Sequence, residues 1–313
     1  MFTSRFKVRL LLGGIFFIIF LLPVFQKTQF PLYGPSSPLS EITDLSLGNS
    51  HTQALNFESI GLKGLRLFYD GGGPFEAAFY FDQYVSHLPN LKRVWLPLTV
   101  FYPHIKVSEN FSSWSFKLYN MSGSDVLKKM VFFETAWRQK VKGWLTIKEK
   151  IRQKLGLASS LKNHIFVDGV SLPCSIMKHD EIARGVEKSV VQQTSLLDKD
   201  NLRGYDLLEG IVVEAARRGI EVVFYMPPFT REYFTSPYLD DFRAQFRVQL
   251  AELSAKHVNL TYLDFHDLFY DNYRNFFYDN NHLNCFGAAA FSKVIYEAFI
   301  ESQKKIISMI DKT

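Results

Sequence analysis

The stretch that decides the fold is residues 41–51, EITDLSLGNSH, in which an apolar strand pattern ends at a Gly-Asn-Ser-His turn. A second stretch, residues 65–73 (LRLFYDGGG), has the same form, because a short apolar run is ended by glycines. We expect a helix after the serine turn, another over residues 74–88 and a third strand over residues 91–100. Strands that alternate with helices indicate a parallel sheet with helices on both faces.

The alternation resumes after residue 203. The patterns predict, in chain order, a helix, a strand, a helix, a strand and a final helix over residues 205–218, 220–225, 238–256, 260–265 and 287–307. The segment between the two parts, about residues 103–203, contains a basic helical stretch at 124–155, read either as an amphipathic helix near a membrane surface or as a solvated helix pair. The predicted fold is a three-layer α/β/α sandwich around a mostly parallel sheet, with a helical insertion.

The composition narrows the function classes. The chain has 313 residues, of which 47% are hydrophobic and 21% charged, a balance typical of a globular protein. Its net charge is only +5, without a long basic stripe, so nucleic acid is not an expected partner. The histidines lack the spacing of a metal site, and Cys174 and Cys285 are too few for a four-cysteine zinc centre. The sequence leaves open whether these two cysteines pair.

The N-terminus has the pattern of a membrane anchor. Basic residues within the first nine positions precede an apolar run over residues 10–25, the order that the insertion machinery recognises. No Ala-x-Ala site follows, so we predict an uncleaved transmembrane anchor over residues 1–28, rather than a cleaved signal peptide or a buried helix. A Pro-, Gly- and Ser-rich linker over 29–40 then leads to a domain over 41–313. The positive-inside rule predicts a single-pass protein of the cell membrane whose bulk is extracytoplasmic.

The turn after the first strand holds the first candidate site residue, Ser50. Functional sites in open α/β sheets form at the carboxyl ends of the strands, and a serine on a tight turn presents its hydroxyl there. Gly48 allows a close approach of the turn, but Thr52 stands where the Gly-x-Ser-x-Gly elbow has its second glycine. The alternative is that Ser50 is simply the N-cap of the following helix.

The second candidate constellation is YDNNHLN, residues 278–284, just before the last helix. An aspartate three residues before a histidine can fold back so that Asp279 meets Nδ1 of His282, which leaves Nε2 to take a proton from a hydroxyl. Asp264 and Asp267 end an earlier strand and are alternative acid partners for His282. The alternative, purely structural interpretation is an Asp/Asn-rich turn that caps the last helix.

Taken together, these blocks resemble the SGNH, or GDSL-like, hydrolase superfamily. The resemblance rests on residues 46–51 (SLGNSH), 70–73 (DGGG) and 277–284 (FYDNNHLN), with Gly287-Ala288 after them. It is strongest to membrane-anchored members of the cell envelope, such as the teichoic-acid D-alanylation protein and the alginate O-acetylation proteins. It covers roughly residues 41–101 and 204–300 and implies a flavodoxin-like sheet.

The resemblance also implies roles for the residues. Ser50 would be the nucleophile, His282 the general base and Asp279 its orienting acid. The oxyanion hole would use the backbone N–H of Ser50 and that of Gly72, with the neighbouring glycines at 71 and 73 left open. The superfamily usually adds an asparagine after the third strand, whereas residues 95–100 here read WLPLTV, so the hydroxyl of Thr99 is the candidate replacement.

Three further residues are candidates for the substrate side of the site. Asn49 either braces the serine turn or reaches the oxyanion, and His51 either caps the helix or touches substrate. Pro228, in the Pro-Pro-Phe sequence after the strand over 220–225, either shapes an acyl or sugar pocket or belongs to a rigid loop. No cofactor or metal is expected.

The function predicted from the sequence is that of a membrane-anchored serine acyl-ester hydrolase or O-acyltransferase acting on cell-envelope glycans. Water as the acyl acceptor gives an esterase, and a sugar hydroxyl gives a transferase. The expected partners are the glycan or acyl-ester substrate, the membrane, and a membrane-bound acyl-transfer protein. The alternative is a catalytically inactive glycan-binding or scaffold protein of an envelope polysaccharide modification complex, which the missing asparagine favours.

Overall fold

The computed structural model describes residues 38–69, 72–105, 165–167, 172–176, 185–186, 189–191, 194, 197 and 202–310. The predicted membrane anchor, most of the predicted linker and the basic helical stretch at 124–155 lie outside these residues. Among the helices of the described ranges, none is both long and apolar enough to cross a membrane. The first described element is the short 3-10 helix η1, Leu39–Glu41, which begins inside the stretch predicted as linker.

A six-stranded sheet forms the centre of the fold, in the order β4-β2-β1-β3-β5-β6. The strands are β1 Asp44–Gly48, β2 Gly64–Tyr69, β3 Arg93–Pro97, β4 Ile165–Val167, β5 Glu221–Met226 and β6 Leu260–Asp264. All neighbours pair in parallel except β4, which is antiparallel to β2. Without β4 the chain order is 2-1-3-4-5, the flavodoxin-like arrangement. The mostly parallel sheet is therefore confirmed.

The edge strand β4 was not predicted as part of the helical insertion. Residues 165–167 come from the segment between 103 and 203, yet they extend the sheet by pairing with Leu67, Phe68 and Tyr69 of β2. The pattern missed this strand because three residues are too few to show a period of two.

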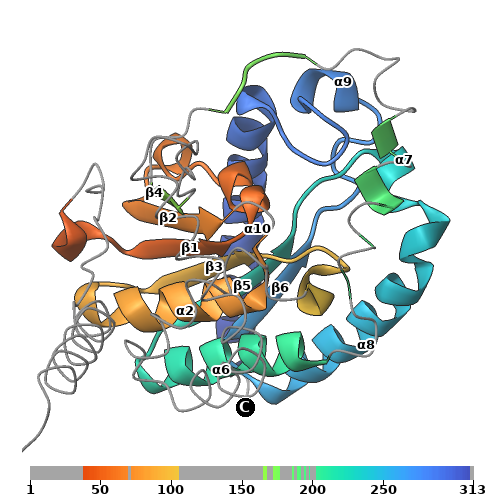
Figure 1. Cartoon of the computed structure of the whole chain (residues 1–313). Helices are drawn as coiled ribbons and strands as arrows, with labels where there is room; N and C mark the ends of the chain where they lie inside the picture. The colour runs from red at the N-terminus through yellow and green to blue at the C-terminus, as the bar shows by residue number, and fades with distance from the viewer. Residues whose placement is uncertain are drawn as a thin grey trace, which may run out of the picture.

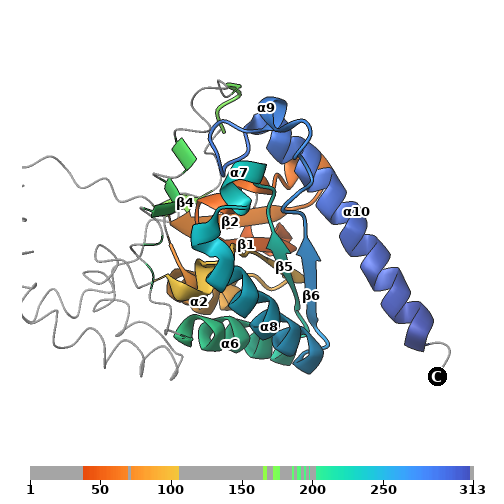
Figure 2. The same ribbon diagram turned by 90° about the vertical axis from the view of Figure 1, so that its right-hand side faces the viewer.

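Helices cover both faces of the sheet (Figures 1 and 2). On one face lie α2 Pro74–Tyr84, α6 Arg203–Arg217 and α8 Asp240–Lys256, and on the other lies the long α10 Cys285–Ile310. The side chains of β5 alternate between two hydrophobic cores, one on each face of the sheet. Phe224 and Met226 belong to the core under α2, α6 and α8, whereas Val223 and Tyr225 belong to the core under α10, as expected for a strand whose side chains alternate between faces.

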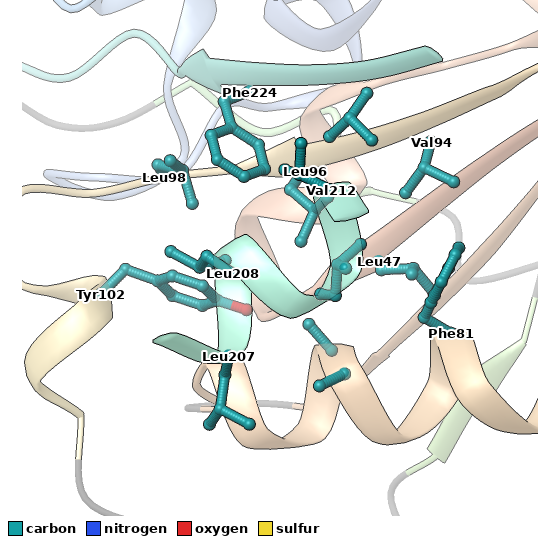
Figure 3. Packing of buried hydrophobic residues seen from close by; sticks show 14 of the residues in the cluster. Leu47, Phe81, Val94, Leu96, Leu98, Tyr102, Leu207, Leu208, Val212 and Phe224 are labelled. Atoms are coloured by element: carbon teal, nitrogen blue, oxygen red, sulfur yellow. The ribbon is translucent and has the colours of Figure 1, made fainter. Parts of the chain in front are cut away.

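The larger core packs three neighbouring strands against α6 (Figure 3). Leu47 of β1, Leu96 of β3 and Phe224 of β5 are each fully buried, and they meet Leu208 and Val212 of α6. Burial of such side chains contributes about 1.5–3 kcal/mol each. This packing fixes the direction of β1, and therefore the place where Ser50 leaves the sheet.

The helix expected after Ser50 is not an α-helix. Two 3-10 helices, η2 Ser50–Ala54 and η3 Glu58–Ile60, connect β1 to β2. The backbone N–H of Asn56 donates to the hydroxyl of Ser292 on α10 at 2.7 Å, so it is not available to extend η2. The third strand is also shorter than predicted, because β3 ends at Pro97.

The remaining short elements lie mainly between the strands and the major helices. They are η4 Val85–His87, η5 Tyr102–His104, α7 Arg231–Phe234, η6 Pro237–Leu239 and α9 Tyr273–Phe276. The turn after β1, the loop after β5 and the loop between α9 and α10 carry the candidate site.

Candidate active site

The serine turn leaves the sheet at Gly48, whose φ of +139° is a conformation that favours glycine. A Cβ atom at Gly48 would also lie 3.3 Å from the hydroxyl of Tyr102 and 3.4 Å from that of Thr52. The next residue, Asn49, is the N-cap of η2, since its side-chain oxygen accepts the backbone N–H of His51 at 3.0 Å. Asn49 therefore braces the turn, and the hydroxyl of Ser50 is not used as a cap.

The second part of the site is a tight loop over residues 276–284. The backbone N–H of Tyr278 donates to the carbonyl of His282 at 3.1 Å, and that of Asn284 donates to the carbonyl of Phe276 at 2.9 Å. The side chain of Asn284 then accepts the N–H of Gly287 at 2.9 Å, which caps α10. A Cβ atom at Gly287 would lie 2.2 Å from the carbonyl oxygen of Phe276, so the glycine allows α10 to start directly beneath the loop.

Two neighbouring segments hold this loop in place. The hydroxyl of Thr230, which follows β5, donates to the carbonyl of Asn280 at 2.7 Å. On the other side, a disulfide joins Cys174 to Cys285, and the backbone N–H of Cys285 donates to the carbonyl of Pro173 at 3.1 Å. The two cysteines whose pairing the sequence left open are therefore bonded, and they tie residues 172–176 to the start of α10.

These supports bring Ser50, His282 and Asp279 together. Ser50 Oγ lies 2.8 Å from Nε2 of His282, although the two residues are 232 positions apart in the chain. Nδ1 of the same ring lies 2.9 Å from Oδ2 and 3.1 Å from Oδ1 of Asp279. When Asp279 accepts a hydrogen bond from the Nδ1–H group, Nε2 presents its lone pair to the serine hydroxyl. This tautomer is the one required for a general base.

Asp279 is well suited to orient the histidine. Its Oδ1 also accepts the backbone N–H groups of His282 at 2.7 Å and Asn281 at 3.0 Å. Partial burial pushes the pKa of Asp279 upward, but its hydrogen bonds and its attraction to His282 hold the pKa below its ordinary value. The carboxylate therefore stays ionised. The alternative acid Asp264 pairs instead with Nδ1 of His266, at 2.8 Å.

A small cleft opens beside Ser50 and His282. Its walls come from the serine turn, the loop after β5, the His282 loop and the disulfide-linked segment, and the lining residues are Ser50, His51, Gln53, Ala54, Leu172, Pro227, Pro228, Asn281, His282 and Leu283. The predicted substrate-side residues Pro228 and His51 thus face the cleft. Asn49 is not among the lining residues and is buried behind the turn.

The predicted oxyanion donors lie at the carboxyl ends of adjacent strands, because Gly72 follows β2, Ser50 follows β1 and Thr99 follows β3. The N–H of Gly73 is already donated to the carboxylate of Glu76 at 2.8 Å, so Gly73 is not a free donor. The hydroxyl of Thr99 is buried and makes no hydrogen bond with the described residues. Neither Gly72 nor Thr99 is among the residues that line the cleft.

Comparison with known proteins gives neighbours in structure alone. No protein-family model and no curated protein sequence matches the chain. A solved structure described as a putative acylhydrolase, from Bacteroides fragilis NCTC 9343, has a TM-score of 0.41 and 12% identity over 87% of this chain and 92% of its own. A GDSL-like lipase from Bacteroides thetaiotaomicron VPI-5482 has a TM-score of 0.38 and 10% identity over 84% and 89%. For this chain, a chemical activity is therefore inferred from the arrangement of Ser50, His282 and Asp279.

Several cleft residues escaped the sequence analysis. Gln53 and Ala54 belong to η2, and Asn281 and Leu283 flank the histidine, so they face the cleft only because of how the two turns bend. Leu172 comes from the segment before the disulfide. The only hint of Leu172 in the sequence is Cys174, two residues further on. Cys174 points to the cleft only once its pairing with Cys285 is known.

Proposed function

We propose that this chain is a serine acyl-ester hydrolase or O-acyltransferase. The observation that carries the proposal is the continuous hydrogen-bonded chain from Ser50 through His282 to Asp279, with Ser50 and His282 lining one cleft. A serine hydroxyl, a histidine base and an orienting carboxylate in this order are the parts needed for nucleophilic acyl transfer.

In the first half of the reaction, Ser50 Oγ attacks the acyl carbonyl while His282 Nε2 takes the hydroxyl proton. The carbonyl oxygen becomes an oxyanion, for which the N–H groups of Ser50 and Gly72 are the candidate donors. The imidazolium of His282, held by Asp279, then protonates the oxygen of the leaving alcohol. The ester C–O bond breaks and the acyl group remains on Ser50.

In the second half, a water or a sugar hydroxyl replaces the departed alcohol. His282 removes its proton as it attacks the acyl carbon, and the proton is then returned to Ser50 Oγ when the acyl–serine bond breaks. Hydrolysis and transfer therefore use the same three side chains. They differ only in which hydroxyl the cleft places beside His282.

The proposed setting is the extracytoplasmic side of the cell membrane, with envelope glycans or their acyl esters as substrates and a membrane-bound acyl-transfer protein as the partner. The basic and then apolar order of residues 1–28 supports an anchor. The bond between Cys174 and Cys285 supports an oxidising compartment. Alkaline phosphatase fused to the C-terminus tests this topology, since activity is expected in intact cells and its absence would contradict the proposal.

The experiment that tests the catalytic proposal is fluorophosphonate labelling of the full-length chain in detergent. Wild type is expected to be labelled, whereas Ser50→Ala and His282→Ala should each abolish the label. Ser59→Ala, on η3, is the control and should label as wild type does. A folded wild type that takes no label, or a label that survives Ser50→Ala, would contradict the proposal. In the first case the scaffold function becomes the better account, because the oxyanion donor expected after β3 is absent.

A further inference from the structure

The second histidine of the cleft, His51, has a fixed position beside the proposed base. Its ring stacks on the ring of His282, with centroids 4.7 Å apart and planes at 16°. It also meets Phe229 edge-on at 5.4 Å, and its backbone N–H is held by Asn49. The residue is buried, with a relative exposure of 5%. Its orientation is therefore set by packing on two sides.

The ring of His51 makes no hydrogen bond with the described residues, whereas its backbone N–H is bonded to Asn49. The residue lines the cleft. Three other histidines of the described residues bind carboxylates, namely His257 with Glu209, His266 with Asp264 and His282 with Asp279. A polar group that enters the cleft can therefore bond the donor and the acceptor nitrogen of this imidazole.

The surroundings of His51 keep it neutral. Burial lowers the pKa of His51 well below its ordinary value, and the charge of His282 lowers it further, against a smaller opposite effect of Asp279. A neutral imidazole carries one N–H donor and one acceptor nitrogen. A neutral His51 also adds no second positive charge beside His282.

We propose that His51 binds the alcohol part of the ester, and so selects esters of sugars and other polyols over esters of simple alcohols. This inference rests on the proposed acyl-ester function. His282 must protonate the leaving oxygen, so that oxygen lies at the edge of the His282 ring. The His51 ring lies directly alongside, and a hydroxyl on a neighbouring carbon of the alcohol would reach its nitrogens. The same contact would place the acceptor sugar in a transfer reaction.

The test compares two substrates for Ser50-dependent hydrolysis by the full-length chain. One is an O-acetylated monosaccharide with a free hydroxyl next to the ester, and the other is p-nitrophenyl acetate. His51→Phe keeps an aromatic ring against His282 but removes both nitrogens. We expect the ratio of kcat/KM for the sugar ester to that for the phenyl ester to fall about 3- to 10-fold, the effect of one neutral hydrogen bond.

Two further variants make the result specific. His51→Gln restores a donor and an acceptor and should recover part of the ratio, whereas His266→Phe, outside the cleft, should leave the ratio unchanged. An unchanged ratio in His51→Phe, or equal losses on both esters, would overturn the assignment of His51. If His51→Phe does not fold, a ratio in His51→Gln equal to that of a non-polar His51→Leu overturns it instead. Failure of the proposed function looks different, because wild-type hydrolysis of both esters would then be absent or would survive Ser50→Ala.

Discussion

Two histidine–aspartate pairs at the carboxyl edge of the sheet are nearly identical in geometry. Asp279 accepts from Nδ1 of His282 at 2.9 Å, and Asp264 accepts from Nδ1 of His266 at 2.8 Å. The side-chain exposures also match, at 20% and 24% for the histidines and 41% and 42% for the aspartates. In each pair, hydrogen bonds to the histidine outweigh burial and lower the pKa of the aspartate.

The pairs differ in what faces the other ring nitrogen. Nε2 of His282 lies 2.8 Å from the hydroxyl of Ser50, whereas no hydroxyl group of the described residues bonds His266. His282 also stacks on a second imidazole, while His266 stacks on Phe234, with centroids 4.0 Å apart. An oriented histidine is therefore a common structural feature, and the serine delivered by β1 is what turns one of them into a candidate catalytic base.

The largest expected difference between the pairs concerns the histidines. His282→Gln should lower kcat/KM for an acetyl ester about 1000-fold or more, because the serine loses its base. His266→Gln should stay within about threefold of wild type. Steady-state kinetics on the two variants, with circular dichroism as a folding control, measures this. A similar loss in both variants would mean that the serine is not what distinguishes the pairs.

The aspartates give the next largest contrast. Asp279→Asn should lower kcat about 100- to 10,000-fold, because an amide no longer selects the tautomer that leaves Nε2 as the acceptor. Asp264→Asn should change kcat little. The rates are to be compared at one pH in the same buffer. If the two substitutions had equal effects, Asp279 would not be the orienting acid of the site.

The disulfide is a further difference between the two pairs, because it holds the segment beside His282 and not the one beside His266. Replacing Cys174 and Cys285 together by serine should lower the free energy of unfolding by about 2–4 kcal/mol, measured by urea denaturation. The substitution should also raise KM, since Leu172 loses its anchor at the cleft wall. Unchanged stability would show that the remaining contacts of residues 172–176 suffice to hold the wall.

The smallest expected effect is a pH dependence of stability from the stacked imidazole. The folded-state pKa of His51 lies below its ordinary value of 6.5, so the unfolded chain binds more protons in the window below that pH. Stability should therefore rise with pH up to about 6.5 and level off above it. His51→Phe should flatten this rise. Denaturation of both proteins at pH 5 and pH 8 measures it, and equal slopes would mean that His51 is not held neutral.

The sequence was sufficient for the framework of the protein and for two residues of the candidate site, Ser50 and His282. Short apolar runs marked β1, β2, β3, β5 and β6, and glycine or proline follows most of them, because buried parallel strands carry a strong local signal. Ser50 and His282 stood out because each belongs to a turn directly beside a major element. The spacing before His282 favoured Asp279 over Asp264. In the structure Asp264 pairs with a different histidine, His266.

Other features depend on contacts that no local pattern encodes. The end of η2 at Ala54 goes with a hydrogen bond from the backbone N–H of Asn56 to Ser292, which are 236 residues apart. Likewise, the parallel placement of His51 on His282 depends on the contact between η2, which contains His51, and α10, which begins just after His282. A period of apolar residues reports which face of an element is buried, but not which distant residue it will meet there.

The bond between Cys174 and Cys285 also sets an order of events during biosynthesis. The cysteines are separated by 111 residues, so the first thiol waits about 6–22 s for its partner at a synthesis rate of about 5–20 residues per second. During that interval it is exposed to any oxidant or competing thiol. The histidine loop and the wall at Leu172 are covalently joined only after this interval, which makes the candidate site one of the last parts of the protein to mature.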